Sequence, residues 1–137
     1  MLHLASFPFV TFYLHDIGCN ALEAVWGDYV SSSFFREAVQ QAISFVRQHQ
    51  VSGWVADDRR LGPMEREDLA WVGLEVLPAL AAAGLRRLAM LESDDWLNRR
   101  LIEEEYTFPV ESLAIEVRHF TDPRAARRWA CGLPEDA

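Results

Sequence analysis

Lysine is absent from this chain of 137 residues, and all 13 of its cationic side chains are arginines. Without lysine, a protein cannot form a Schiff base with a substrate or supply the lysine of a phosphate-binding loop. It also cannot use a lysine as a general base. The sequence therefore excludes several classes of enzyme.

Cysteine is scarce as well. Cys19 and Cys131 lie near opposite ends of the chain, with no CxxC or Cys/His spacing. This pattern is typical of neither a zinc site nor a disulfide framework, so it predicts two free, buried thiols. No Lys or Arg precedes Arg36, and Pro8 interrupts the apolar amino terminus, so a secretory signal with a basic start is not recognisable. We therefore expect a protein of the reducing cytoplasm.

Long apolar runs and excess positive charge are also missing. The longest charge-poor stretch, 69–85, contains Glu75 and Pro78, which makes it too short and too interrupted to span a membrane. The 21 acidic residues outnumber the cations and give a net charge of −8. Because such a charge repels phosphate backbones and anionic lipids, we expect no nucleic-acid partner and no membrane span.

Half of the chain is apolar and 12% is aromatic, which indicates one folded domain over residues 1–137. Periodicity and turn signals predict strands at 9–15, 21–30, 53–56, 87–91 and 113–120, the last of them at an edge of the sheet. Helices are expected after the serines at 31–33, over about 65–83 with a bend at Pro78 and an end at Gly84, over about 95–106, and from Asp122-Pro123 onward. The order β-β-α-β-α-β-α-β-α predicts an α/β fold, with a mixed, mostly parallel sheet that has one antiparallel member and is covered by helices.

Four segments carry a resemblance to a known family: Gly53-Trp54-Val55-Ala56-Asp57-Asp58-Arg59-Arg60-Leu61-Gly62, then Trp71, Leu77-Pro78, and Ala83-Gly84-Leu85-Arg86-Arg87-Leu88-Ala89. With the opening hairpin, they resemble the STAS fold, and more closely the small bacterial proteins called STAS/SEC14-like or SpoIIAA-like, over about 34–129. The resemblance implies a single STAS-like domain that acts by binding. Signalling members carry a phosphorylated Ser or Thr after the third strand. Residues 54–92 contain no Ser, Thr or Tyr, so this chain lacks that switch.

The cluster Asp57-Asp58-Arg59-Arg60 follows a predicted strand, and ligands of open α/β sheets bind beyond the carboxyl ends of strands. There, an aspartate can anchor a ligand or metal and an arginine can bind a carboxylate or phosphate. Alternatively, an aspartate shapes the loop through backbone amides and pairs with the arginines. We predict a ligand- or partner-binding site with Asp57, Asp58 and Arg59 on its polar side, and with three residues on its apolar side: Trp54, Trp71 and Leu77.

The helix expected over Leu69 to Ala83 has more apolar surface than one core face needs. Helical periodicity places a core face on one side, formed by Leu69, Val72, Val76 and Leu80, and leaves Trp71, Leu74 and Leu77 on other sides. A soluble monomer seldom exposes such a surface. We therefore expect this helix to form a homodimer interface or to line an apolar pocket.

The favoured hypothesis is a non-catalytic binding or regulatory module that recognises a protein or a small amphipathic ligand, with no cofactor and no metal. One alternative is a small metal-dependent or acid/base enzyme that uses Asp57 or Asp58 with a histidine such as His119. A second alternative is a carrier of a lipid or other amphipathic molecule, which would need a dry cavity of ~300–1,000 Å³.

Two further catalytic hypotheses are weaker. Asp16 and Asp57 together suggest a Mg²⁺ pocket like that of response-regulator receivers, but those proteins need a lysine and lack an opening hairpin. A hydrolytic triad could combine His15 or His119 with Ser93, but the sequence has no GxSxG motif.

Overall fold

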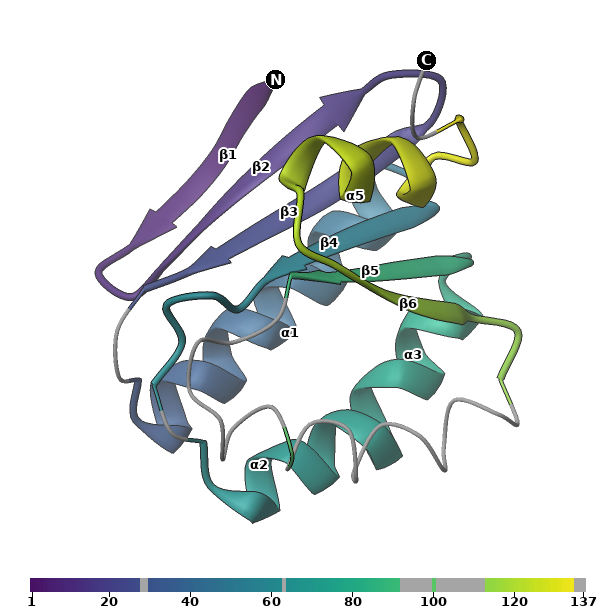
Figure 1. Cartoon of the computed structure of the whole chain (residues 1–137). Coiled ribbons are helices and arrows are strands. Elements are labelled where there is room, and N and C mark those ends of the chain that lie inside the picture. The colour runs from purple at the N-terminus through teal and green to yellow at the C-terminus, as the bar shows by residue number, and fades with distance from the viewer. Residues whose placement is uncertain (28–29, 63, 92–99, 101–112, 135–137) are drawn as a thin grey trace.

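A computed structural model describes residues 1–27, 30–62, 64–91, 100 and 113–134 (Figure 1). The strands are β1 (Leu2–Phe7), β2 (Val10–Asp16), β3 (Asn20–Trp26), β4 (Gly53–Asp57), β5 (Arg87–Leu91) and β6 (Glu116–Phe120). The helices are α1 (Ser32–Gln48), α2 (Arg66–Trp71), the π-helical segment η1 (Val72–Val76), α3 (Leu77–Ala82) and α5 (Pro123–Ala130). The predicted third helix, 95–106, lies outside the described residues apart from Arg100.

The six strands form one sheet in the order β1-β2-β3-β4-β5-β6. The pairs β1/β2 and β2/β3 are antiparallel, and the three pairs from β3 to β6 are parallel. Only β2 therefore runs against the other strands, and β6 lies at an edge. The predicted α/β class with a mixed, mostly parallel sheet is confirmed.

Strand β1 was not predicted, because Pro8 looked like an interruption of the apolar amino terminus. In the structure, Phe7 pairs with Val10, so Pro8 and Phe9 form a two-residue turn between β1 and β2. Proline fixes φ near the value that the first central residue of a common turn requires. Pro8 is thus the corner of an additional hairpin.

The sheet is covered differently on its two faces. Helices α1, α2 and α3 cover one face, and α5 crosses the other over β4, β5 and β6 (Figure 1). The first face holds the larger core, which includes Phe12, Leu22, Trp54 and Leu88. The second face holds a smaller core around Val55, Ala89, Phe120 and Trp129. Alternating residues of β4 therefore belong to different cores.

Segments α2, η1 and α3 form one continuous stretch of helix from Arg66 to Ala82. The Leu77 amide donates to the Val72 carbonyl, five residues back, as in a π-helix. The buried positions follow the i, i+3, i+4, i+7, i+8 spacing of a helix with one broad core face: Leu69, Val72, Gly73, Val76, Leu77 and Leu80. The prediction that Leu77 lies off the core face was wrong, because it assigned too narrow a core face to this helix.

The ends of several helices follow the sequence signals. The long helix ends at Gly84, which has a φ of 108°, and the Leu85 amide donates to the Leu80 carbonyl at 3.0 Å, as in a Schellman motif. Asp122 caps α5 by accepting from the amides of Arg124 and Ala125, both at 3.3 Å. Both predictions are confirmed. Ser31 occupies the N-cap position of α1, although its side chain makes no capping bond.

The prediction of two free thiols was wrong, because Cys19 and Cys131 form a disulfide with their Cα atoms 5.2 Å apart. Cys19 lies in the turn between β2 and β3, and Cys131 follows α5. The carboxyl end of α5 reaches the start of β4, where a Cβ on Gly53 would overlap the carbonyl of Ala130. Tertiary structure thus joins two cysteines that sequence spacing alone keeps apart.

Among the residues that the structure describes, no helix combines the length and apolar character needed to cross a membrane.

Candidate functional site

The predicted site residues surround the carboxyl end of β4. All five residues of this strand are buried, as expected for a strand covered on both faces. Trp54 and Ala56 belong to the core under α1 to α3, and Val55 belongs to the core under α5. The same alternation directs Asp57 toward the α5 face, while Asp58 lines a cavity on the other face.

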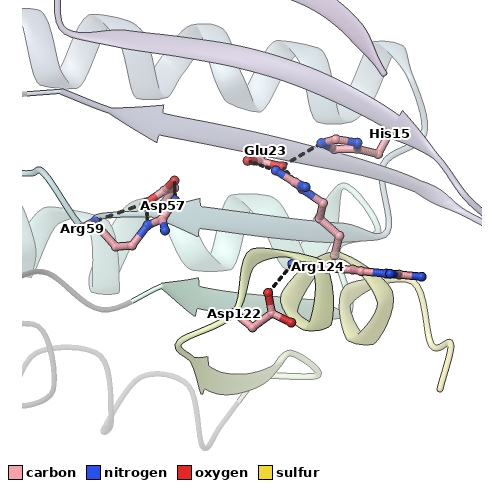
Figure 2. A network of polar contacts seen from close by, with 7 residues as sticks. His15, Glu23, Asp57, Arg59, Asp122 and Arg124 are labelled. Carbon is pink, nitrogen blue, oxygen red and sulfur yellow. Dashed lines mark hydrogen bonds and ion pairs between the residues drawn. The ribbon is translucent and has the colours of Figure 1, made fainter. Parts of the chain in front are cut away.

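Asp57 is fully engaged by its neighbour Arg59. Its carboxylate accepts hydrogen bonds from Arg59 Nε at 2.9 Å, from Arg59 Nη2 at 2.8 Å and from the Arg59 backbone amide at 3.3 Å (Figure 2). This is the geometry of a loop-shaping aspartate with a bidentate arginine. The carboxylate of Asp57 therefore holds the turn after β4.

A polar network on the same face was not predicted. Glu23 of β3 is 2% exposed and accepts from His15 Nε2 at 2.7 Å, from Arg127 Nε at 2.6 Å and from Arg127 Nη2 at 3.0 Å (Figure 2). Burial alone would raise the pKa of Glu23, but the bonds from His15 and Arg127 outweigh it and lower the pKa to about 2. Because an ionised carboxylate only accepts, Nε2 of His15 must carry a proton. A single carboxylate in the apolar run ALEAVW is the signal that could have indicated a buried charge.

The opposite face contains a cavity of about 60 Å³ between the sheet and the helices. Its walls are aromatic and aliphatic with one exception, Asp58; the other lining residues are Trp26, Phe35, Val39, Trp54, Ala56, Leu61, Met64, Leu69, Val72, Val76, Leu77, Leu80, Leu88 and Met90. The long helix supplies five of them, four from the core face that the sequence assigned to it and Leu77; Trp71 and Leu74, which suggested a pocket or a dimer interface, are not among them. Asp58 is the only ionisable residue among the described residues of this lining.

Asp58 is 6% exposed, yet within the described ranges no hydrogen bond or ion pair reaches its carboxylate. Its main chain is held firmly: the amide donates to the Leu91 carbonyl and the carbonyl accepts from the Leu61 amide, both at 3.1 Å. Burial, and secondarily the charge of Asp57, raises the pKa of Asp58 from 3.8 to about 7. Among the described residues, the cavity therefore has one ionisable group, whose pKa lies near neutral pH.

One wall of the cavity is fixed by a second buried aspartate. Asp68 of α2 is 2% exposed and accepts from Ser32 Oγ at 2.7 Å and from Arg36 Nε at 2.9 Å, both from α1. The guanidinium carbon of Arg36 lies 4.8 Å from the ring centre of Trp71. These contacts fasten the start of the long helix to α1 and so help to keep the cavity walls in place.

The structure brings together only some of the predicted site residues. Trp54, Leu77 and Asp58 line the cavity, whereas Asp57 and Arg59 lie at the other face. Trp71 is not part of the lining; it packs edge-on against Phe35. The sequence interpretation missed Trp26, Phe35, Met64 and Met90, because their meeting point depends on how β3, α1 and β5 pack.

The weaker catalytic arrangements do not form around Asp57. Asp16 pairs with Asn20 at the start of β3, whereas Asp57 ends the parallel strand β4, so the two lie at opposite ends of the sheet. His119 is exposed on β6, and β5 separates this strand from β4. Across the described part of the chain, no group of three or more His, Cys, Asp or Glu side chains could hold a metal ion.

Comparison of the chain with known protein families, with curated proteins and with solved structures found no match.

Proposed function

We propose that this protein is a non-catalytic binding module whose site is the cavity at the carboxyl end of β4, with Asp58 as its polar anchor. One observation carries the proposal: a carboxylate that is only 6% exposed faces apolar walls and receives no hydrogen bond from the described residues. Its oxygens keep some contact with solvent, because no side-chain oxygen or nitrogen of the described residues is both fully buried and without a hydrogen-bond partner. A carboxylate placed among apolar walls still has a desolvation penalty, and carboxylates with a pKa perturbed in this way are typical of functional sites. A ligand that donates a hydrogen bond to Asp58 would remove this penalty.

The size of the cavity limits the ligand. A volume of about 60 Å³ is below the range of ~300–1,000 Å³ typical of drug-sized ligands, although one water needs only ~10–15 Å³. The site therefore fits a few non-hydrogen atoms, either a very small molecule or the end group of a larger one. A carrier that encloses a whole lipid fits this geometry less well.

The proposal can be tested with methyl NMR under xenon pressure and with native mass spectrometry of freshly purified protein. Xenon should shift the methyl signals of Val72, Leu88 and Met90, which line the cavity, and leave those of Ala89 and Ala126 on the other face unchanged. Native spectra should show a co-purified small molecule that Asp58→Asn protein lacks. Absence of both effects would contradict the proposed site.

A second candidate is acid/base catalysis, because the pKa of Asp58 is raised to about 7. A general acid or base works best when its pKa lies near the working pH. Asp58 would then transfer a proton to or from a substrate in the cavity, without help from His119 on β6. A turnover that falls with Asp58→Asn, and depends on pH with a midpoint near 7, would favour this candidate over simple binding.

Three expectations from the sequence belong to the same proposal. The opening hairpins followed by α/β units support the STAS-like, SpoIIAA-like assignment. A homodimer through the long helix stays a prediction; Leu74, 68% exposed, is the helix residue that supports it. Light scattering during gel filtration would detect the dimer by its molar mass. The variant Leu74→Glu should then have the mass of a monomer.

A cytoplasmic location also stays a prediction, and the Cys19–Cys131 disulfide gives it a direct test. Reducing compartments keep thiols free, whereas oxidising ones preserve disulfides. Alkylation of protein trapped at the moment of cell lysis should label both cysteines in a cytoplasmic protein. Failure to label them would contradict the cytoplasmic location.

A further inference from the structure

Three aromatic rings share the cavity with Asp58. Trp26 comes from β3, Phe35 from α1 and Trp54 from β4, and all three are at most 6% exposed. The rings of Trp26 and Phe35 lie with their centres 5.1 Å apart and their planes tilted by 39°. The remaining lining side chains are aliphatic or thioether groups. The described lining thus combines three aromatic rings and one carboxylate in a small apolar space.

This combination favours a cation. The faces of Trp and Phe rings attract a positive charge within about 6 Å of the ring centre, and the attraction grows when the site is dry. Neither Arg nor His is among the described residues that line the cavity, so none of these residues offsets the charge of Asp58. The charge of Asp57, which raises the pKa of Asp58, is itself paired with Arg59. A positively charged ligand would therefore be stabilised by both the rings and the carboxylate.

The number of hydrogen-bond donors decides which cation fits. A primary ammonium carries three N–H donors, and within the described lining it would meet one carboxylate and otherwise apolar side chains. Each donor buried without a partner is costly. A trimethylated ammonium has a single N–H donor for Asp58, and its three methyl groups match the apolar walls. With four non-hydrogen atoms it also suits a cavity of about 60 Å³.

We propose that the cavity binds a methylated ammonium group, held by the carboxylate of Asp58 and by the rings of Trp26, Phe35 and Trp54. The inference rests on the proposed function, because it needs the cavity to admit a ligand. The bound group can be a free methylated amine or the end of a longer molecule. Both sources present the same methylated cation to the cavity.

The experiment uses trimethylammonium chloride as the probe and follows the indole N–H signals of the intact protein by NMR titration. The signals of Trp26 and Trp54 should shift with a dissociation constant of about 1 mM or tighter, as expected for a ligand of this size. Trp129, a residue of α5 that packs against the opposite face of the sheet, is an internal control and should not shift. Three control compounds are titrated in the same way. Ammonium chloride lacks the methyl groups, tert-butanol has the methyl groups without the charge, and pivalate carries a negative charge in place of the positive one.

Asp58→Asn keeps the shape of the side chain and removes its charge, so it should weaken trimethylammonium binding by about tenfold or more. Asp57→Asn, the matched control, removes a charge from the adjacent residue on the other face and should change binding by less than about twofold. Trp54→Phe should retain most of the affinity, and Trp54→Leu should lose it. Binding should also tighten between about pH 6 and pH 8, as Asp58 becomes ionised.

The outcomes separate this inference from the proposed function. If tert-butanol or ammonium binds as tightly as trimethylammonium, or if Asp58→Asn binds it unchanged, the methylated-ammonium proposal is wrong and the cavity remains a ligand site. If xenon does not reach the cavity either, the proposed function fails with it. If larger dimethylammonium compounds such as N,N-dimethylethanolamine, which keep one N–H donor, bind more tightly than trimethylammonium, the ligand is the end group of a longer molecule.

Discussion

Asp57 and Asp58 are neighbours in sequence, but their carboxylates lie on opposite faces of the sheet. Asp57 accepts three hydrogen bonds from Arg59 beside α5, whereas Asp58 lines an apolar cavity under the long helix. The alternation of side chains along an extended strand causes this separation. The two aspartates thus have different surroundings: Asp57 holds the turn after β4, and Asp58 places a carboxylate in the cavity.

The first prediction concerns stability as a function of pH. Because the pKa of Asp58 is raised from 3.8 to about 7, the folded protein holds a proton that the unfolded chain releases between these values. The stability that this bound proton gives to the folded protein is therefore fully present below about pH 4 and is lost as the pH rises through about 7. Asp58→Asn should make the protein more stable at pH 8 by up to about 4 kcal/mol and flatten this pH dependence. Urea denaturation at several pH values measures both effects.

Asp57→Asn is the control for that measurement and should have the opposite sign. It removes the charged acceptor that Asp57 provides for the amide and guanidinium of Arg59, although the Arg59 side chain is 44% exposed and can turn to water. We expect a loss of about 1–2 kcal/mol at pH 8. If Asp58→Asn also lowered stability at pH 8, a partner for its carboxylate would have to exist, and the cavity would not be a lone-carboxylate site.

A second prediction concerns Glu23, whose bonds to His15 and Arg127 join β2, β3 and α5. The lowered pKa of Glu23 gives stability that is present above about pH 4.5 and is lost as the pH falls toward 2. Glu23→Gln should cost about 2–3 kcal/mol at pH 7, since it weakens charge-assisted hydrogen bonds inside the protein. The cost should shrink at pH 3 and below. Equal losses at pH 7 and pH 2 would show that the charge of Glu23 does not matter.

Arg127→Lys separates charge from geometry in the same network. A lysine keeps the positive charge but cannot make the two parallel bonds of the guanidinium to Glu23. We expect it to lose about half of the stability that Glu23→Gln loses, and the double variant should show strong non-additivity. Additive losses would mean that the Arg127 and Glu23 side chains stabilise the protein independently.

A third prediction concerns the disulfide, which joins residues 112 apart in sequence. Closing such a long loop restricts the unfolded chain, so reduction should lower the free energy of unfolding by about 2–4 kcal/mol. Cys19→Ser with Cys131→Ser should unfold like the reduced protein and should not respond to reductant. Thermal unfolding with and without dithiothreitol provides the measurement. Alkylation of two thiols in purified protein that has been exposed to an oxidant would contradict the bond.

The sequence predicts much of this fold because the relevant signals are local. The cap at Asp122, the helix end at Gly84 and the buried strand at 53–56 each depend on a few consecutive residues, and all are present. The features that it misses depend on distant contacts. Cys131 meets Cys19 only when α5 crosses the sheet, and Leu77 is buried because the core covers a broader face of the long helix than the sequence interpretation assigned to it.

The candidate site was also predicted only in part: its local signals were recognised, and its distant contacts were missed. The cluster after β4 was recognised because strand ends are visible in sequence, but which aspartate faces which side depends on the register of a buried strand. The rings of Trp26 and Phe35 come from β3 and α1, and only packing brings them to Asp58. The partners of Glu23 are likewise 8 and 104 residues away, too far for any local pattern to connect.

The last prediction concerns Gly53, where β4 begins directly beneath the end of α5. A Cβ at this position would overlap the backbone carbonyl of Ala130, which cannot move without shifting the whole helix. Gly53→Ala should therefore cost about 3 kcal/mol or more, toward the upper end of what overpacking causes, and should loosen α5.

Gly84→Ala is the comparison for that substitution. Gly84 has a φ of 108° and open space around a Cβ, so its replacement introduces backbone strain alone, about 1–3 kcal/mol. Hydrogen exchange should then separate the two variants: Gly53→Ala should speed the exchange of amides in α5, such as Ala126 and Trp129, more than Gly84→Ala does at matched overall stability. Equal exchange in α5 would mean that close contact at Gly53 does not hold this helix on the sheet.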